Sequence, residues 1–238
     1  MKDGPYREHR KQWEFCYISN ALEHYGKLQQ GFKGLGFAVG KEPLAALFVK
    51  RGAKLTLTDM PAEDSLAAGW AKTKQHAGLL KDSFRPNIVD FKEFEAKAEF
   101  VPVNMNEIPS DLIKGEYDFT YSASSLEHVG SVELGRKFIL NAMDSLKVGG
   151  VAVHTTEFAI NSLTDPGKFD WMSVWLKKDV ELLAKELRHK NCTLLPVNYD
   201  VLDNLSIDDL PYSNSKHFIL RLENTIHTSI GFIITKNH

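Results

Sequence analysis

The chain has 238 residues and a formal net charge of −2, and 43% of its residues are hydrophobic and 25% charged. These proportions are typical of a single globular domain, and the near-neutral charge does not favour binding to nucleic acid. No apolar run approaches the ~18 residues of a membrane span, and the charged start lacks a signal-peptide core. We therefore expect one cytoplasmic domain over 1–238, without membrane insertion or a metal site, with Cys16 and Cys192 reduced.

Helical and strand patterns alternate along most of the chain. Pro43 suits the first turn of a helix and Gly52 its end, because proline lacks an N–H and glycine tolerates a left-handed backbone. Such alternation predicts an α/β fold whose parallel sheet is covered on both faces. The expected helices are 10–29, 43–51, 65–80, 134–146 and 174–189, and the expected strands are 35–39, 54–58, 100–103, 117–122, 151–156 and 193–199.

The end of the chain departs from this alternation. Two strand-like runs, 218–222 and 226–235, are separated by only three residues. A parallel connection needs a dozen residues or more, whereas antiparallel neighbours need only a tight turn. We therefore expect the sheet to finish with an antiparallel hairpin.

The stretch "GLGFAVGKEP" after the first strand predicts a ligand site at the carboxyl ends of the strands. Gly34, Gly36 and Gly40 do not have the dinucleotide spacing, and no Ser or Thr follows Lys41 as a P-loop requires. Glu42 at the helix start would repel a phosphate but suits a ligand with an ammonium and a sulfonium, such as S-adenosylmethionine. Asp59, at the end of the second strand, would then accept hydrogen bonds from both ribose hydroxyls.

Four stretches together resemble class I S-adenosylmethionine-dependent methyltransferases over 31–236: "GLGFAVGKEP", Asp59, "VPVNMNEIP" and "YDFTYSASSLEHVGS". The resemblance implies a Rossmann-like fold with a seven-stranded, mostly parallel sheet, an antiparallel C-terminal hairpin and helices on both faces. It also implies a cofactor site formed by Gly34, Gly36, Gly40, Glu42, Asp59, Met60, Asn104, Met105 and Ser122.

Two positions depart from the family pattern. Ala38 adds a methyl group where a glycine usually lets the backbone approach the cofactor. Asn104 replaces an acid that usually meets the adenine amine, although an amide oxygen can accept the same hydrogen bond. Both changes predict weakened cofactor affinity rather than its loss.

Three side chains are candidates for acid–base chemistry. His128 follows the fourth strand on the ligand side, and an unperturbed histidine titrates near neutrality, so His128 is the leading candidate for a general base. Its alternatives are capping the next helix or packing against the cofactor. His154 and Glu157 come from "HTTEF" at the end of the fifth strand, on opposite faces if the strand continues that far.

The acceptor is expected to contact segments outside the core pattern, at 159–176 and 203–217, while residues 1–30 form an N-terminal helical cap. The first segment carries Trp171 and Trp175, which suit stacking on a sugar or another ring, and the second carries Tyr212 and His217. Core packing is an equally good explanation for the aromatic residues.

The stretches "LEHVGS" and "HTTEF" resemble more narrowly bacterial methyltransferases associated with surface-polysaccharide biosynthesis. This resemblance implies O-methylation of a sugar or another small precursor of a capsule or lipopolysaccharide. Two alternatives stay open: a small-molecule N-methyltransferase, which needs no strong base, and a non-catalytic module that binds the cofactor.

Overall fold

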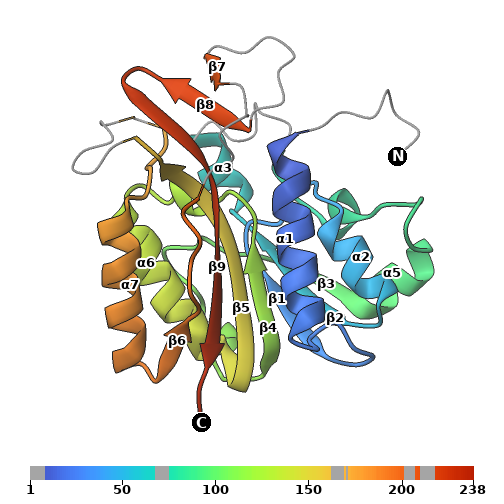
Figure 1. Ribbon diagram of the computed structural model, residues 1–238. Coiled ribbons are helices and arrows are strands. Elements are labelled where there is room, and N and C mark those ends of the chain that lie inside the picture. Colours follow the sequence, from blue (N-terminus) through green and yellow to red (C-terminus); the bar gives the residue numbers. More distant parts are fainter. Residues whose placement is uncertain (1–8, 68–74, 162–168, 170, 201–206, 210–217) are drawn as a thin grey trace.

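In the part of the chain that the structure describes, a nine-stranded sheet forms the centre, with helices on both faces (Figure 1). The computed structural model describes residues 9–67, 75–161, 169, 171–200, 207–209 and 218–238. The strand order is β3-β2-β1-β4-β5-β9-β8-β7, and β6 also pairs with β9. The strands are β1 Lys33–Gly36, β2 Lys54–Asp59, β3 Ala98–Pro102, β4 Tyr117–Ser122, β5 Leu146–Ala159, β6 Cys192–Leu194, β7 Ile207–Asp209, β8 Ile219–Leu222 and β9 Thr225–Lys236.

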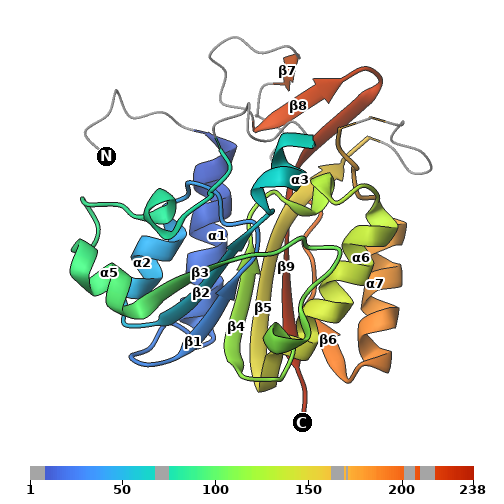
Figure 2. The ribbon, with the colours of Figure 1, turned by 180° about the vertical axis from the view of Figure 1, so that it is seen from behind.

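Two apolar layers hold the helices against the sheet. α6 and α7 cover one face, where Phe138 and Trp175 are buried, and α1, α2 and α5 cover the other, where Phe48 and Phe119 are buried (Figure 2). No helix in the described part of the chain is long and apolar enough to cross a membrane. The α-helices are α1 Arg10–His24, α2 Leu44–Lys50, α3 Ala62–Ala67, α5 Phe91–Lys97, α6 Val132–Ala142 and α7 Lys177–His189.

The predicted arrangement is confirmed in its main features. β1 to β5 pair in parallel, whereas β9 runs antiparallel to β5, β6 and β8. The long pairing of β9 with β5, from Val151↔Thr235 to Ala159↔His227, places the C-terminal hairpin beside the ends of the parallel strands. Among the described residues the sheet is wider than the seven strands predicted: β8 corresponds to the predicted run 218–222, and β7, which was not predicted, pairs with it at the edge.

Several predicted boundaries are wrong. α1 ends at His24 instead of continuing to residue 29, because Gly26 adopts a left-handed backbone with φ +64°. The helix predicted at 65–80 is not continuous: α3 ends at Ala67, and 75–79 is not helical. The strand predicted at 193–199 ends at Leu194.

Candidate active site

A cavity of about 320 Å³ lies where the parallel strands end. It is bounded by α1 and by residues 37–43, between β1 and α2, which we call the glycine turn. Such a position, at the carboxyl ends of the strands, is the usual ligand site of open α/β sheets. The lining includes charged groups of both signs, amides and hydroxyls, so it can bind a polar ligand. The lining residues are Lys11, Phe15, Ala38, Gly40, Lys41, Glu42, Asp59, Met60, Gln75, His76, Val103, Asn104, Met105, Asn106, Ala123, Ser124, Ser125, His128 and Val129.

The glycine turn forms one wall of this cavity. Val39 N–H donates to the Thr58 carbonyl at 3.0 Å, which ties the turn to β2. Gly40 has φ +52°, and a Cβ there would lie 2.9 Å from the Gln75 carbonyl oxygen, so the position requires glycine. Ala38 has φ +46°, a conformation that an alanine adopts at a cost of about 1 kcal/mol.

Gly34 and Gly36, which were predicted to form part of the cofactor site, do not line the cavity. A Cβ on Gly34 would lie 2.2 Å from the Phe119 ring, and one on Gly36 would lie 2.7 Å from the Tyr121 hydroxyl. Both distances are far below van der Waals contact. These glycines therefore let β1 pack against the aromatic side chains of β4.

Asp59 connects three segments around the cavity. Its Oδ2 accepts the N–H of Gly40 at 3.1 Å and of Ala77 at 2.9 Å, and its Oδ1 accepts the Met60 N–H at 2.8 Å. Burial raises the pKa of Asp59, and these donors offset the shift only in part. A carboxylate can accept about four hydrogen bonds, so Asp59 has room for one ribose hydroxyl rather than the two expected.

The turn after β3 supplies a second polar wall. Asn104 and Met105 line the cavity as does Met60. The Asn104 Oδ1 accepts the Asn106 N–H at 3.0 Å, which closes an Asx turn. The side-chain amide N–H of Asn106 donates to the Val129 carbonyl at 3.0 Å and joins this turn to the segment after β4.

His154 and Ser122 lie in the core rather than in the cavity lining. Both are fully buried, and the Ser122 hydroxyl and His154 Nδ1 are 2.8 Å apart. The His154 ring packs edge-on against Phe138, on the α6 side of the sheet. Burial lowers the pKa of His154 to about 3, so the ring stays neutral and has no access to an acceptor.

His128 lines the cavity and has a defined tautomer. Its Nδ1 is 2.9 Å from the Trp171 carbonyl oxygen, and its ring stacks on the Trp171 ring. A carbonyl can only accept, so Nδ1 carries the proton and a neutral ring has its lone pair on Nε2. Burial lowers the pKa of His128, although the hydrogen bond to Trp171 opposes the shift. The neutral, proton-accepting form is therefore favoured at neutral pH.

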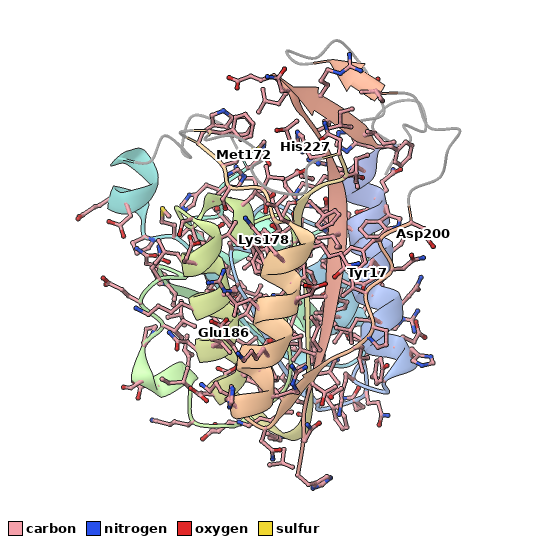
Figure 3. All side chains as sticks on the ribbon, turned by 60° about the vertical axis from the view of Figure 1, so that its left-hand side comes forward. Tyr17, Met172, Lys178, Glu186, Asp200 and His227 are labelled. Atoms are coloured by element: carbon pink, nitrogen blue, oxygen red, sulfur yellow. The ribbon has the colours of Figure 1, made fainter. Side chains whose placement is uncertain are left out.

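Glu157 belongs to a buried charged cluster, which we define as Glu14, Glu127 and Glu157 with Arg10 and His227. Arg10 donates to the Glu157 carboxylate, and His227, at the start of β9 (Figure 3), donates from Nδ1 at 2.7 Å. Burial alone would raise the pKa of Glu157, but Arg10 and His227 outweigh it and lower the pKa to about 2. Glu157 therefore holds α1 and β9 onto β5 and does not line the cavity.

The two other acids of the cluster are bound by hydroxyl groups. Glu14 is fully buried and accepts hydrogen bonds from Ser124 and, at 2.5 Å, from Ser229. Glu127 accepts from Thr156 at 3.1 Å. Burial and the charges of Glu157 and Glu14 raise the pKa of Glu127 to about 8, so this carboxyl is mostly protonated at neutral pH.

The two tryptophans of the first predicted acceptor segment differ in exposure. Trp175 is fully buried against Phe232, whereas Trp171 is 55% exposed above His128. Core packing therefore explains Trp175, and only Trp171 is placed to meet an acceptor. Within 159–176, residues 162–168 and 170 lie outside the described residues, as do 203–206 and 210–217 of the second segment, including Tyr212 and His217.

Sequence reasoning missed the lining residues that come from outside the motifs. Lys11 and Phe15 reach the cavity from α1, and Gln75 and His76 reach it from the segment that was predicted to be helical. The Ser125 hydroxyl is buried at the cavity without a hydrogen-bond partner among the described residues. The "SASS" stretch was the one signal for Ser125, and nothing in the sequence distinguished Lys11 from its charged neighbours.

Solved structures with a similar fold include several methyltransferases and a [4+2]-cyclase. The sequence matches no protein-family model and no curated protein. An S-adenosylmethionine-dependent methyltransferase from Clostridium acetobutylicum has a TM-score of 0.55 at 11% identity, covering 99% of this chain and 94% of that one. The magnesium protoporphyrin IX methyltransferase of Synechocystis with bound S-adenosylhomocysteine gives 0.54 at 13% identity, covering 97% and 89%.

A candidate sarcosine dimethylglycine methyltransferase from Galdieria sulphuraria gives a TM-score of 0.54 at 17% identity, and it covers 79% of this chain. This chain spans 61% of the length of that neighbour. The protein therefore has the Rossmann-like fold of class I S-adenosylmethionine-dependent methyltransferases. At such identities the likeness establishes the fold alone.

Replacing Ala38 with glycine should tighten the binding of S-adenosylhomocysteine by about three- to tenfold. The change removes a methyl group from the cavity wall, which is the reason for the tighter binding. It also removes about 1 kcal/mol of left-handed backbone strain, which affects folding but not binding, because the strain is the same in the free and the bound protein. The stability should change by less than about 0.5 kcal/mol, because glycine also increases the entropy of the unfolded chain. Titration calorimetry and thermal unfolding measure the two effects, and weaker binding would show that the methyl group contacts the ligand favourably.

Proposed function

We propose that this protein is an S-adenosylmethionine-dependent methyltransferase that methylates an oxygen of a sugar or another small precursor of a surface polysaccharide. The observation that carries the cofactor assignment is that Asp59 and Glu42 both line the cavity beside Gly40, in a protein with a class I methyltransferase fold. Two carboxylates favour a ligand with hydroxyls and an ammonium over a phosphate. The neighbour that holds S-adenosylhomocysteine supports the same assignment.

The residues present fit this cofactor. Asp59 has room to accept one more hydrogen bond, as a ribose hydroxyl requires, and Asn104 and Met105 offer an amide and an apolar surface for an adenine. Glu42 is placed for an ammonium. When bound, S-adenosylmethionine supplies a methyl group to a nucleophile.

The protein's part in the reaction is to orient the acceptor and remove a proton from it. His128 takes the proton of an acceptor hydroxyl on Nε2, while its Nδ1–H remains on the Trp171 carbonyl. The exposed face of Trp171 provides a stacking surface for a sugar ring. The surface-polysaccharide acceptor rests on the resemblance of "LEHVGS" and "HTTEF", and the cavity's hydroxyl and amide groups agree with a hydroxyl-rich acceptor.

Replacing His128 with asparagine should reduce kcat by about 100-fold, the effect typical of a lost general base. Formation of S-adenosylhomocysteine would be followed with a panel of nucleotide sugars and free monosaccharides. The affinity for S-adenosylhomocysteine, measured by calorimetry, should stay within about twofold. His189→Asn, an exposed substitution on α7, is the matched control and should leave both quantities unchanged.

The same measurements separate the alternatives. Turnover of an amine acceptor that is insensitive to His128→Asn would favour N-methylation, because a neutral amine needs no strong base. Binding of the cofactor without turnover of sugar or amine acceptors would favour a non-catalytic module. Absence of binding in the folded wild type would contradict the cofactor assignment itself.

A further inference from the structure

A pair of opposite charges marks one end of the cavity. Lys11 Nζ, from the first turn of α1, lies 3.5 Å from Glu42 Oε1, which belongs to the glycine turn. Both side chains line the cavity and are mostly buried, at 29% and 16% exposure. Gly40, whose N–H binds Asp59, is two residues before Glu42, so the charged pair and Asp59 lie at the same turn.

Local helix preferences explain Lys11 only in part. The first turn of α1 contains no acid, and the helix dipole disfavours a cation there. Two carboxylates face the ammonium: Glu14, three residues further along α1, at 3.6 Å, and Glu42, which comes from outside the helix, at 3.5 Å. Burial would lower the pKa of Lys11, but Glu14 and Glu42 outweigh it and raise the pKa, so Lys11 stays charged.

The pair is electrostatically incomplete. Burial raises the pKa of Glu42 to about 8 although Lys11 opposes the shift, so a second cation beside this carboxyl would stabilise its ionised form. Lys11 has three N–H donors and faces two carboxylates among the described residues, which leaves one donor for a ligand. A ligand with one ammonium and one carboxylate would satisfy both members.

We propose that Lys11 and Glu42 together bind the amino-acid end of the cofactor, with Lys11 donating to its carboxylate and Glu42 accepting from its ammonium. This inference rests on the proposed function. It makes α1 a part of the cofactor site. Lys11 then gives S-adenosylmethionine and S-adenosylhomocysteine a higher affinity than ligands that have only the adenosine part.

The test compares two ligands that differ only at this end. S-Adenosylhomocysteine carries the amino acid, whereas 5′-methylthioadenosine keeps the adenosine and a thioether without it. By titration calorimetry, Lys11→Met should weaken S-adenosylhomocysteine by about tenfold, as expected for one charge-assisted hydrogen bond of about 1.5 kcal/mol, and leave 5′-methylthioadenosine within twofold. Glu42→Gln should show the same selectivity, and Lys11→Arg should restore most of the affinity.

The controls distinguish recognition from folding. Lys50→Met, at the exposed end of α2, should change neither affinity. Thermal unfolding of each variant shows whether α1 remains docked. Equal weakening of both ligands by Lys11→Met would overturn the inference, because Lys11 would then act only by holding α1 in place. Unchanged affinity for S-adenosylhomocysteine would also overturn it.

The wild type separates this inference from the proposed function. If the wild type binds 5′-methylthioadenosine but not S-adenosylhomocysteine, adenosine recognition stands and the role of Lys11 and Glu42 is wrong. If the folded wild type binds neither ligand, the cofactor assignment fails, and this inference fails with it.

Discussion

Replacing Glu157 with glutamine should lower the free energy of unfolding by about 3 kcal/mol, because the substitution leaves the buried charge of Arg10 without its main partner. Arg10 and Glu157 are 12% and 4% exposed, so water cannot replace the lost carboxylate, and His227 loses its acceptor as well. For a protein of this size the melting temperature should fall by roughly 6–12 °C. Thermal and urea unfolding measure the change.

An exposed ion pair provides the matched control. Glu23 and Arg51 are 2.6 Å apart, but their side chains are 52% and 46% exposed. Glu23→Gln should therefore cost less than about 0.5 kcal/mol. A cost below 1 kcal/mol for Glu157→Gln would show that Glu14, which faces Arg10 at 3.9 Å, neutralises the cation by itself.

The acid limb of the stability curve follows from the same contacts. The pKa of Glu157 is lowered to about 2, below its value in the unfolded chain near 4.3. Its contribution is therefore complete above about pH 4.3 and is lost as the pH falls towards 2. Glu157→Gln should remove this part of the pH dependence.

Replacing Asp59 with alanine should weaken S-adenosylhomocysteine by about 1,000-fold, or about 4 kcal/mol. A charge-assisted hydrogen bond to a ribose hydroxyl contributes about 1.5–3 kcal/mol. The rest comes from the cavity wall, since Asp59 also holds the N–H groups of Gly40 and Ala77 in position. Titration calorimetry measures the affinity, and circular dichroism confirms that the variant is folded.

An acid nearby in the sequence serves as the control. Glu63, on the exposed side of α3, does not line the cavity, and Glu63→Ala should leave the affinity within twofold. Asp59→Asn keeps the shape but turns an amide N–H₂ towards backbone donors, so it should resemble alanine more than the wild type. Affinity within tenfold for both Asp59 variants would contradict a cofactor role for this residue.

Local sequence patterns predicted the fold well where the tertiary structure keeps the elements that they favour. β4 has the predicted bounds, and the short connection before β9 predicted its antiparallel pairing. Prediction failed at 65–80, where the Gln75 carbonyl accepts the Lys41 N–H of the glycine turn and the Ala77 N–H donates to Asp59. Helical propensity does not register such long-range partners. α5 was not predicted at all, because its seven residues provide too short a pattern and, unlike α2, it has no proline at its start and no glycine at its end.

The polar end of β5 shows why strand alternation did not identify the site. Alternation correctly separated His154 from Glu157, but it could not show whether either face was open. Helices cover both faces: His154 packs beside Phe138 of α6, and Glu157 pairs with Arg10 of α1. A polar strand end therefore became a buried structural cluster.

The sequence by itself determined the α/β fold and its antiparallel ending. It also placed Gly40, Glu42, Asp59 and Asn104 at or after the carboxyl ends of the first three strands. These features depend on local spacing, which a chain carries in its order of residues. Only the tertiary structure decided that α1 closes the cavity with Lys11 and that His128, not His154, lines it. Those choices depend on contacts between segments far apart in the chain, and their energies come from burial and charge pairing that no local pattern encodes.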